Sequence, residues 1–154
     1  MADLIFTPID KDNWLTAYKL KVKPDQNNFV AENGKSMLQA MYDTEHNMQP
    51  YGIFDGETMV GFMLTGHNKD EANAIWIVRF MVGSEHQRKG YGKRALTQFL
   101  AKTTAEGEYA QVKLSYVPEN TGAAALYKQV GFVEEGLKEE WGEIVASYTV
   151  NKDE

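Results

Sequence analysis

The chain has 154 residues, of which 43% are hydrophobic and 25% are charged, and its formal net charge is -6. We therefore expect residues 1–154 to form one globular domain with its own core. The acidic charge argues against a nucleic-acid partner, and no apolar run approaches the roughly 18 residues of a membrane span. The N-terminus lacks the basic and apolar stretches of a signal peptide, so a cytoplasmic location is expected. Without cysteine, disulfides, thiolate metal ligands and cysteine nucleophiles are excluded.

The N-terminal segment predicts a strand followed by two helices. Residues 4–9 are typical of a strand, and Asp10 can cap a helix that carries Trp14. Ser36 and Gln39 match a capping box, which predicts the start of a second helix. The apolar residues of that helix share one face: Met37, Leu38, Met41 and Tyr42.

The middle of the chain predicts three strands. Residues 50–54 and 58–65 flank Asp55-Gly56, a pair that supplies the backbone angles of a tight turn, so they indicate a hairpin. Residues 74–82 are almost continuously apolar, which is typical of a central strand covered on both faces. Arg79 is the exception within that strand.

The C-terminal half predicts two more helices, each followed by strand. A helix begins after Gly90-Tyr91-Gly92 and ends at Gly107, and a strand at residues 111–117 follows, parallel to the central strand. Asn120 can cap a short helix that Gly131 closes in a left-handed conformation. Two strands, at about 132–137 and 143–150, finish the chain. The sum is an α/β domain with a mixed sheet and helices on both faces.

Glycines and basic residues gather at the start of the helix near residue 90. Gly90 and Gly92 lack Cβ atoms and let backbone N–H groups approach an anion, and the helix dipole adds about half a positive charge there. Four of the 16 basic residues stand within the same stretch: Arg88, Lys89, Lys93 and Arg94. They indicate an anion site, and the alternative is an ordinary solvated helix start.

Residues 90–95 also match the G-x-G-x-x-A pattern of dinucleotide-binding folds. In those folds the first glycine directly follows the strand, and an acid ends the next strand. Here Val82 and Gly90 are separated by seven residues, and the next strand ends in Ser115-Tyr116-Val117 without an acid. A Walker loop is excluded because no Gly-Lys-Ser/Thr is present at this turn.

Two spaced motifs in this order resemble the GNAT superfamily of acyl-CoA N-acetyltransferases. The first is Gln87-x-x-Gly90-x-Gly92 after Val82, and the second is Asn120-x-x-Ala123-x-x-Leu126-Tyr127-x-x-x-Gly131-Phe132. The resemblance implies a GNAT-like fold, with a central sheet of about seven strands between helices. The chain also resembles, less closely, the bacterial diamine and spermine/spermidine acetyltransferases. This looser resemblance rests on Trp76-x-x-Arg79-Phe80, Val22-x-x-x-Gln26 and Gly142-Glu143, although some of those relatives have an acid where this chain has Val78.

The resemblance implies a cofactor, acetyl-CoA, and the residues that hold it. N–H groups of Arg88, Lys89, Gly90, Tyr91, Gly92 and Lys93, after Gln87, would hold the diphosphate of CoA. The strand at Phe80, Met81 and Val82 would bond the pantetheine, and Asn120 would contact the cofactor arm. In the family, a bulge splays this strand from its neighbour and aims a backbone N–H at the thioester oxygen.

Tyr127 is the expected catalytic acid, because a phenol with a pKa near 10 can protonate the departing thiolate. Its other interpretation is a tyrosine that only packs in the core. An amine acceptor with a pKa near 10.4 is neutral in only about one molecule in 2,500 at pH 7, which adds roughly 4.6 kcal/mol to the barrier. Family members often carry a glutamate base on the central strand, but residues 74–82 contain no acid, so the base is unassigned.

Several residues are candidates for binding the amine acceptor, and each also has a purely structural interpretation. Glu32 and Glu143 are candidates for binding a cation, or are solvated surface carboxylates. Trp76 and Trp14 are candidates for lining an acceptor slot, or are core aromatics. The three histidines have no metal-ligand spacing, so no metal is expected. The C-terminal acids are expected to form a solvated rim that attracts polycations: Glu134, Glu135, Glu139, Glu140 and Glu143.

The predicted reaction is direct attack of a primary amine on acetyl-CoA in a ternary complex. Spermidine, spermine or a diamine is the favoured acceptor, and the alternatives are a protein or peptide amine, an aminoglycoside, or a module that senses acetyl-CoA without turnover. The family resemblance also suggests a homodimer.

Overall fold

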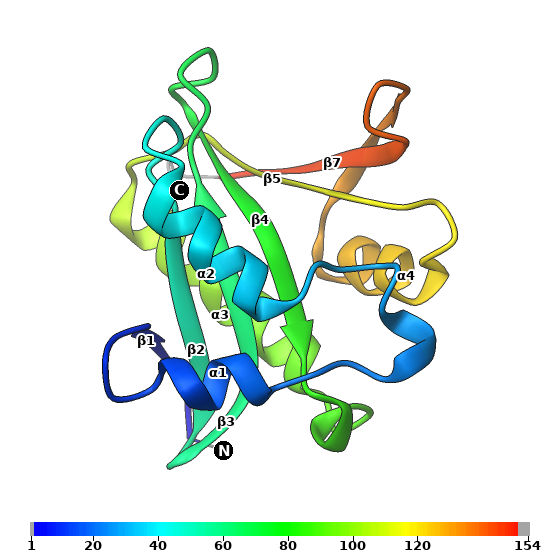
Figure 1. Cartoon of the computed structure of the whole chain (residues 1–154). Coiled ribbons are helices and arrows are strands. Elements are labelled where there is room, and N and C mark those ends of the chain that lie inside the picture. The colour runs from blue at the N-terminus through cyan, green and yellow to red at the C-terminus, as the bar shows by residue number, and fades with distance from the viewer. Residues whose placement is uncertain (1, 151–154) are drawn as a thin grey trace.

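The computed structural model describes residues 2–150 as one mixed sheet with helices on both faces (Figure 1). The elements in chain order are β1 (Ile5–Pro8), α1 (Trp14–Lys19), the 3-10 turn η1 (Pro24–Gln26), α2 (Asn33–Tyr42), β2 (Gln49–Asp55), β3 (Thr58–Gly66), β4 (Ala74–Val82), the 3-10 turn η2 (Ser84–His86), α3 (Tyr91–Glu106), β5 (Gln111–Tyr116), α4 (Thr121–Val130), β6 (Val133–Lys138) and β7 (Glu143–Thr149). Among these residues, no helix is long and apolar enough to span a membrane.

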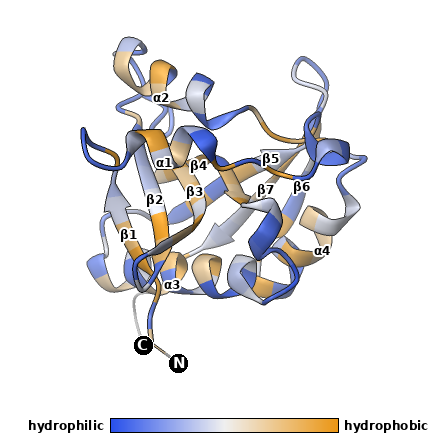
Figure 2. Cartoon of the chain, turned by 60° about the horizontal axis from the view of Figure 1, so that its bottom comes forward, coloured by the Kyte–Doolittle hydropathy of each residue, from blue (hydrophilic) through white to orange (hydrophobic). Residues whose placement is uncertain are grey.

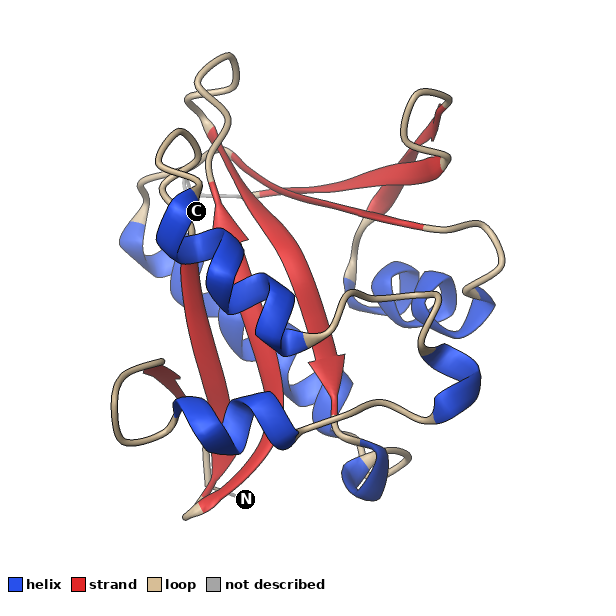
Figure 3. Cartoon of the chain, in the orientation of Figure 1, coloured by secondary structure: helices blue, strands red, loops and turns tan. Residues whose placement is uncertain are grey.

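The sheet has seven strands in the order β1-β2-β3-β4-β5-β7-β6. Neighbouring strands are antiparallel except for β4 and β5, which run parallel and are joined through α3. Helices α1 and α2 cover one face, and α3 and α4 pack against the other (Figures 1 and 3). The predicted mixed α/β sheet is therefore confirmed.

Two apolar clusters lie on the two faces of the sheet, and β3 contributes to both. Phe62 and Leu64 pack toward α1 and α2, whereas Val60 and Met63 pack toward α3 and α4. Figure 2 shows apolar residues along the strands between these helix layers. The sequence suggested residues 74–82 as a central strand covered on both faces, and β4 is the middle strand of the sheet and contributes to both clusters. Most of β4 is only half-buried, because a cleft opens along it.

The caps of α3 and α4 follow from local chemistry, as predicted. The Asn120 side chain accepts the Ala123 N–H at 3.2 Å, which satisfies one of the free donors at the start of α4. Gly131 and Gly107 end α4 and α3 with φ of 115° and 69°, in the left-handed region that favours glycine.

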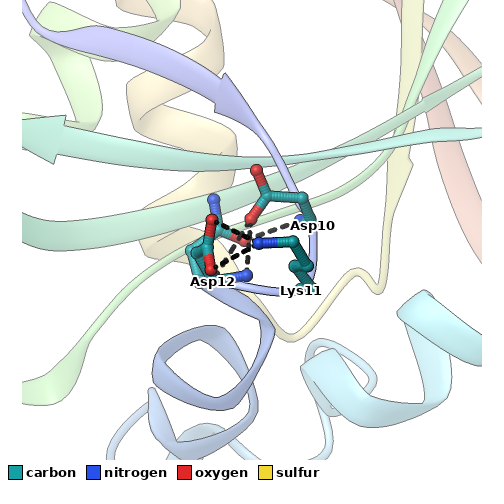
Figure 4. Close-up of polar contacts among 4 residues, drawn as sticks. Asp10, Lys11 and Asp12 are labelled. Carbon is teal, nitrogen blue, oxygen red and sulfur yellow. Dashed lines mark hydrogen bonds and ion pairs between the residues drawn. The ribbon is translucent and has the colours of Figure 1, made fainter.

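The first helix begins later than the cap at Asp10 suggested. The Asp10 carboxylate accepts the N–H groups of Asp12 and Asn13, at 2.8 and 3.2 Å (Figure 4). These bonds stabilise a turn, and α1 follows it with Asn13 as its N-cap residue. Asp10 therefore organises the approach to α1 rather than the helix itself.

The capping box at Ser36 is wrong, because α2 begins three residues earlier, at Asn33. The Asn33 side chain donates to the carbonyls of Ala17 and Leu20 at 2.9 and 3.2 Å, so a contact with α1 determines where α2 starts. Ser36 is consequently buried inside the helix, and its hydroxyl has no hydrogen-bond partner among residues 2–150.

The apolar residues of α2 also behave differently from the simplest expectation. Met37 packs against the core, but Leu38, Met41 and Tyr42 are exposed. The single apolar face predicted for these four residues is therefore wrong, because only Met37 turns toward the core.

We predict that Gly131→Ala lowers the free energy of unfolding by about 2 kcal/mol. A Cβ there would lie 3.1 Å from the Tyr148 ring, at a φ that alanine rarely adopts. Gly122→Ala, in the same helix, is the matched control, because its Cβ meets no atom within 4 Å. We expect this control to be neutral or to gain up to about 1 kcal/mol from helix propensity. Urea denaturation measures both, and equal losses would contradict the prediction.

Candidate functional site

A cleft of about 1060 Å³ runs along β4, where β4 and β5 separate. The two strands pair only from Ala74↔Gln111 to Ile77↔Leu114, and beyond that point they diverge (Figure 3). The segment between α1 and α2 crosses in front of the opening, and its residues 26–31 line the cleft (Figure 1). Residues from α3, α4 and β7 complete the lining.

The separation coincides with a β-bulge in β4. Leu64 of β3 pairs with Arg79, but the next residue, Thr65, pairs with Ile77, so Val78 is the additional residue. The bulge reverses the alternation of side chains: Ile77 and Phe80 both pack toward α3 and α4, and Val78 packs toward α1 and α2. The splayed strand implied by the family resemblance is therefore present.

The turn after β4 places backbone N–H groups at one end of the cleft. Gln87 ties this turn to the strand, since its side chain donates to the Val82 carbonyl at 2.9 Å and exchanges hydrogen bonds with Gln26. Arg88 has a φ of 63° and Gly90 a φ of 85°, so the chain turns sharply before α3 begins at Tyr91. Within residues 2–150, no side chain caps this helix start.

This helix start has the properties of an anion site. The first N–H groups of a helix have no partner within the helix, and the helix dipole makes this end positive. Arg88 and Lys93 line the cleft beside them. A Cβ on Gly92 would lie 3.1 Å from Leu126 of α4, so glycine allows α3 and α4 to approach closely here. The arrangement suits a diphosphate, with the splayed strand beside it for an extended arm.

Tyr127 of α4 lines the middle of the site among aromatic residues. Its ring lies 5.5 Å from that of Tyr116 and 5.9 Å from that of Phe132. Burial raises the pKa of Tyr127 to about 12, so the phenol keeps its proton at neutral and moderately alkaline pH. Asn120, whose side chain caps α4, also lines the cleft.

The other end of the cleft combines aromatic rings with carboxylates. Trp76 and Trp141 meet edge to face at 6.0 Å, and the Trp76 indole donates to Glu71 at 3.1 Å. Hydrogen bonding to Lys113, and secondarily to Trp76, lowers the pKa of Glu71. Glu143 of β7 accepts the Ser115 hydroxyl at 2.7 Å and faces the cleft.

Asp43 follows α2 and adds a second carboxylate to this end of the lining. His46 contacts it at 2.8 Å, and this hydrogen bond holds the pKa of Asp43 below its ordinary value. Arg79 lies between the two ends of the cleft, with its guanidinium bonded to the Val78 carbonyl and to Gln39 of α2.

Most of the predicted site residues line this one cleft. They are Trp76, Phe80, Met81, Val82, Gln87, Arg88, Gly90, Tyr91, Gly92, Lys93, Asn120, Tyr127 and Glu143. Lys89, Glu32 and Trp14 are not among the lining residues. Glu32 precedes α2 with its side chain 73% exposed and 3.6 Å from Lys21, so the structure does not bring it into the cleft. Trp14 lies half-exposed on α1.

Sequence reasoning missed several lining residues near the aromatic end of the cleft, among them Trp141, Asp43 and Gln39. Each comes from a loop or helix that no motif marks, so only the fold brings them to β4. Among residues 2–150, no cluster of three or more potential metal ligands is found.

Comparison with known proteins agrees with this geometry. The sequence signature of the acetyltransferase (GNAT) family matches residues 12–132. No protein of curated function matches the sequence.

Several solved structures share the fold at low sequence identity. Spermidine N-acetyltransferase from Vibrio cholerae, in complex with CoA and spermine, is 16% identical with a TM-score of 0.76, and the match covers 97% of each chain. An acetyltransferase from Salmonella typhimurium that modifies the N-terminal serine of a 50S ribosomal subunit protein is 12% identical, with a TM-score of 0.78 over 98% of this chain and 97% of that one. The protein AAC(6')-Ib, in complex with paromomycin and acetyl-CoA, is 13% identical, with a TM-score of 0.79 over 96% of this chain and 94% of that one.

These neighbours differ in the amine-bearing molecule that their names record, so they do not identify the acceptor of this chain. The family signature, which spans most of the chain, agrees with the splayed β4 and the uncapped start of α3. The chain therefore belongs to the acetyltransferase (GNAT) family and is an acetyl-CoA-dependent N-acetyltransferase.

Proposed function

We propose that the enzyme acetylates a primary amine of a small polycationic acceptor, such as spermidine, spermine or a diamine. The observation that carries this proposal is the far end of the cleft, where Glu143 faces the space beside the Trp76–Trp141 pair. A carboxylate and aromatic faces attract ammonium groups. The solved neighbour with bound spermine supports the same class of acceptor.

The charges around Glu143 leave it available for a cation. Among residues 2–150, no lysine or arginine forms an ion pair with it within 4 Å. Two cations are nearby. Lys138 stands opposite Glu143 in the β6–β7 register, but its ammonium lies over the Trp141 ring. The Arg79 guanidinium donates to Val78 and Gln39 instead. The charge of Arg79 therefore acts on Glu143 only at a distance, and an acceptor ammonium can make a direct ion pair with Glu143.

We infer a direct transfer within a ternary complex, since the chain has no cysteine to carry the acetyl group. Acetyl-CoA supplies an activated acetyl thioester. The turn at residues 87–93 holds the diphosphate, β4 at Phe80–Val82 lies along the pantetheine, and Asn120 contacts the cofactor arm. The amine of the acceptor attacks from the end that Glu143 lines.

Tyr127 is the proposed acid that protonates the departing thiolate. Its raised pKa, about 12, keeps the phenol protonated in the pH range where the acceptor amine loses its own proton. The base that assists this deprotonation has no assigned residue. Homodimer formation and a cytoplasmic location stay predictions of the sequence.

We expect Tyr127→Phe to lower kcat about tenfold or more, with nearly unchanged CoA affinity. In the parent enzyme, kcat/KM should rise as the pH approaches the acceptor pKa, and Tyr127 should add no falling limb below about pH 11, since its pKa is about 12. Steady-state kinetics and calorimetry with CoA measure these effects. Equal turnover in the variant and the parent would remove Tyr127 from the mechanism.

The acceptor class is tested by a kinetic panel of spermidine, spermine, a diamine, an N-terminal peptide and an aminoglycoside. Turnover of the peptide or the aminoglycoside without any polyamine would reject the proposed acceptor. CoA binding without turnover of any amine would favour a sensing module.

Within the same panel, Glu143→Gln should raise KM for spermidine by roughly tenfold, because it removes a charge that faces the acceptor. Glu140→Gln is the matched control, since Glu140 is exposed and does not line the cleft. We expect the control to change KM by less than about twofold. The same rise in both variants would show that only the net charge matters.

Gly90→Ala tests the anion site and should weaken CoA binding about tenfold. Alanine is strained at a φ of 85°, so the N–H groups of the turn should shift. Gly142→Ala is the control: it has a φ of 68°, and a Cβ there, as at Gly90, meets no atom within 4 Å. Both variants should lose similar stability, but only Gly90→Ala should change the Kd measured by calorimetry. Unchanged CoA affinity in Gly90→Ala would contradict the anion site.

A further inference from the structure

The bulge in β4 has a side chain bonded to its main chain. Val78 has no partner in the β3 register, and it lies beyond Ile77, the last β4 residue paired with β5. The neighbouring Arg79 folds back, and its Nη1 donates to the Val78 carbonyl at 3.1 Å. Its Nη2 donates to the Gln39 side chain of α2 at 3.3 Å. One guanidinium thus joins the bulge to the helix that covers it.

The positions around the bulge explain why this contact matters for the cleft. Ile77 and Phe80 pack toward α3 and α4, so both residues between them, Val78 and Arg79, are accommodated on the side of α1 and α2. A strand without the additional residue would continue the regular alternation, and it could continue the pairing with β5 beyond Ile77. That pairing would close the slot.

We propose that Arg79 is a positioning residue, which holds the bulge of β4 in the shape that keeps the slot between β4 and β5 open for acetyl transfer. This inference rests on the proposed direct transfer from acetyl-CoA to an amine. Arg79 acts through the backbone of β4, and the acceptor itself is bound by other residues.

The chemistry of the side chain supports this role. A guanidinium has a rigid fork that can donate to two acceptors in fixed directions, whereas a lysine ammonium is a flexible point charge. Here the two acceptors belong to different elements, β4 and α2. Burying a cation without a directly paired carboxylate is unfavourable, and burial accordingly lowers the pKa of Arg79, although the charge of Glu143 opposes this shift. An arginine at this place in an apolar strand is therefore better explained by geometry than by stability.

The experiment compares Arg79→Met and Arg79→Lys with Gln39→Leu, which removes only the acceptor on α2. With acetyl-CoA and spermidine, Arg79→Met should lower kcat by at least about tenfold and change KM for spermidine by less than about threefold. The kcat of Arg79→Lys should lie between those of Arg79→Met and the parent. Gln39→Leu should lower kcat by about two- to fourfold, because the bond from Arg79 to the Val78 carbonyl stays. Lys102→Met, an exposed position on α3, controls for the lost charge and should match the parent.

A second measurement needs no acceptor. In the free protein, amide hydrogen exchange at residues 77–80 should become at least about tenfold faster in Arg79→Met, while the amides of β3 change much less. A parent enzyme that does not acetylate spermidine would reject the proposed acceptor, and hydrogen exchange would still decide the role of Arg79. The two failures are therefore distinguishable.

Three outcomes would overturn the role of Arg79. Unchanged kcat and unchanged exchange in Arg79→Met would show that the bulge does not need the guanidinium. A raised KM for spermidine at constant kcat would assign Arg79 to acceptor binding. If Arg79→Met does not fold, Gln39→Leu decides: faster exchange at residues 77–80 supports the role, and parental exchange rejects it.

Discussion

The additional residue in β4 is the structural feature on which the site depends. At Val78 the strand leaves its regular register with β3, and just before it, at Ile77, the parallel pairing with β5 ends. From there the two strands diverge, and the cleft occupies the space between them. A sheet that continued its regular pairing would have no such opening, because neighbouring strands lie only about 4.8 Å apart.

Two side chains attach to β4 at the two ends of its splayed segment. Gln87 bonds the Val82 carbonyl and so attaches the turn at residues 87–93 to the end of the strand. Arg79 bonds the Val78 carbonyl and attaches the bulge to α2. Both contacts use main-chain oxygens, so the segment between them has a defined length and direction. That geometry sets the distance between the anion end of the cleft and its aromatic end.

The sequence predicts the parts of the fold that local chemistry determines. Asn120, Gly131 and Gly107 cap helices through bonds or backbone angles confined to a few residues, and the structure confirms them. The hairpin around Asp55-Gly56 is similarly local. The order and type of the strands follow from these elements, because they leave few ways to build one mixed sheet.

Tertiary contacts explain where the predictions fail. Ser36 looked like a cap, but the bonds of Asn33 to the Ala17 and Leu20 carbonyls start α2 earlier. The nearly continuous apolar pattern of β4 contains no alternation, so it could not indicate that the side chains change faces at Val78. Trp141 and Asp43 reach the cleft only because β7 and α2 are placed beside it.

The distribution of charge along the cleft suits the two oppositely charged ligands of the proposed reaction. Arg88, Lys93 and the start of α3 make one end positive, whereas Glu143 and Asp43 line the other. Residues of β4, all apolar except Arg79, separate the two ends, and a less polar wall screens their charges less than water does. A diphosphate is therefore disfavoured at the acidic end, and a cation at the basic end. In the proposed reaction the reacting groups meet between them, beside Tyr127, whose burial keeps its proton in place. Under that proposal, the polarity of the cleft orients both substrates before either contacts Tyr127.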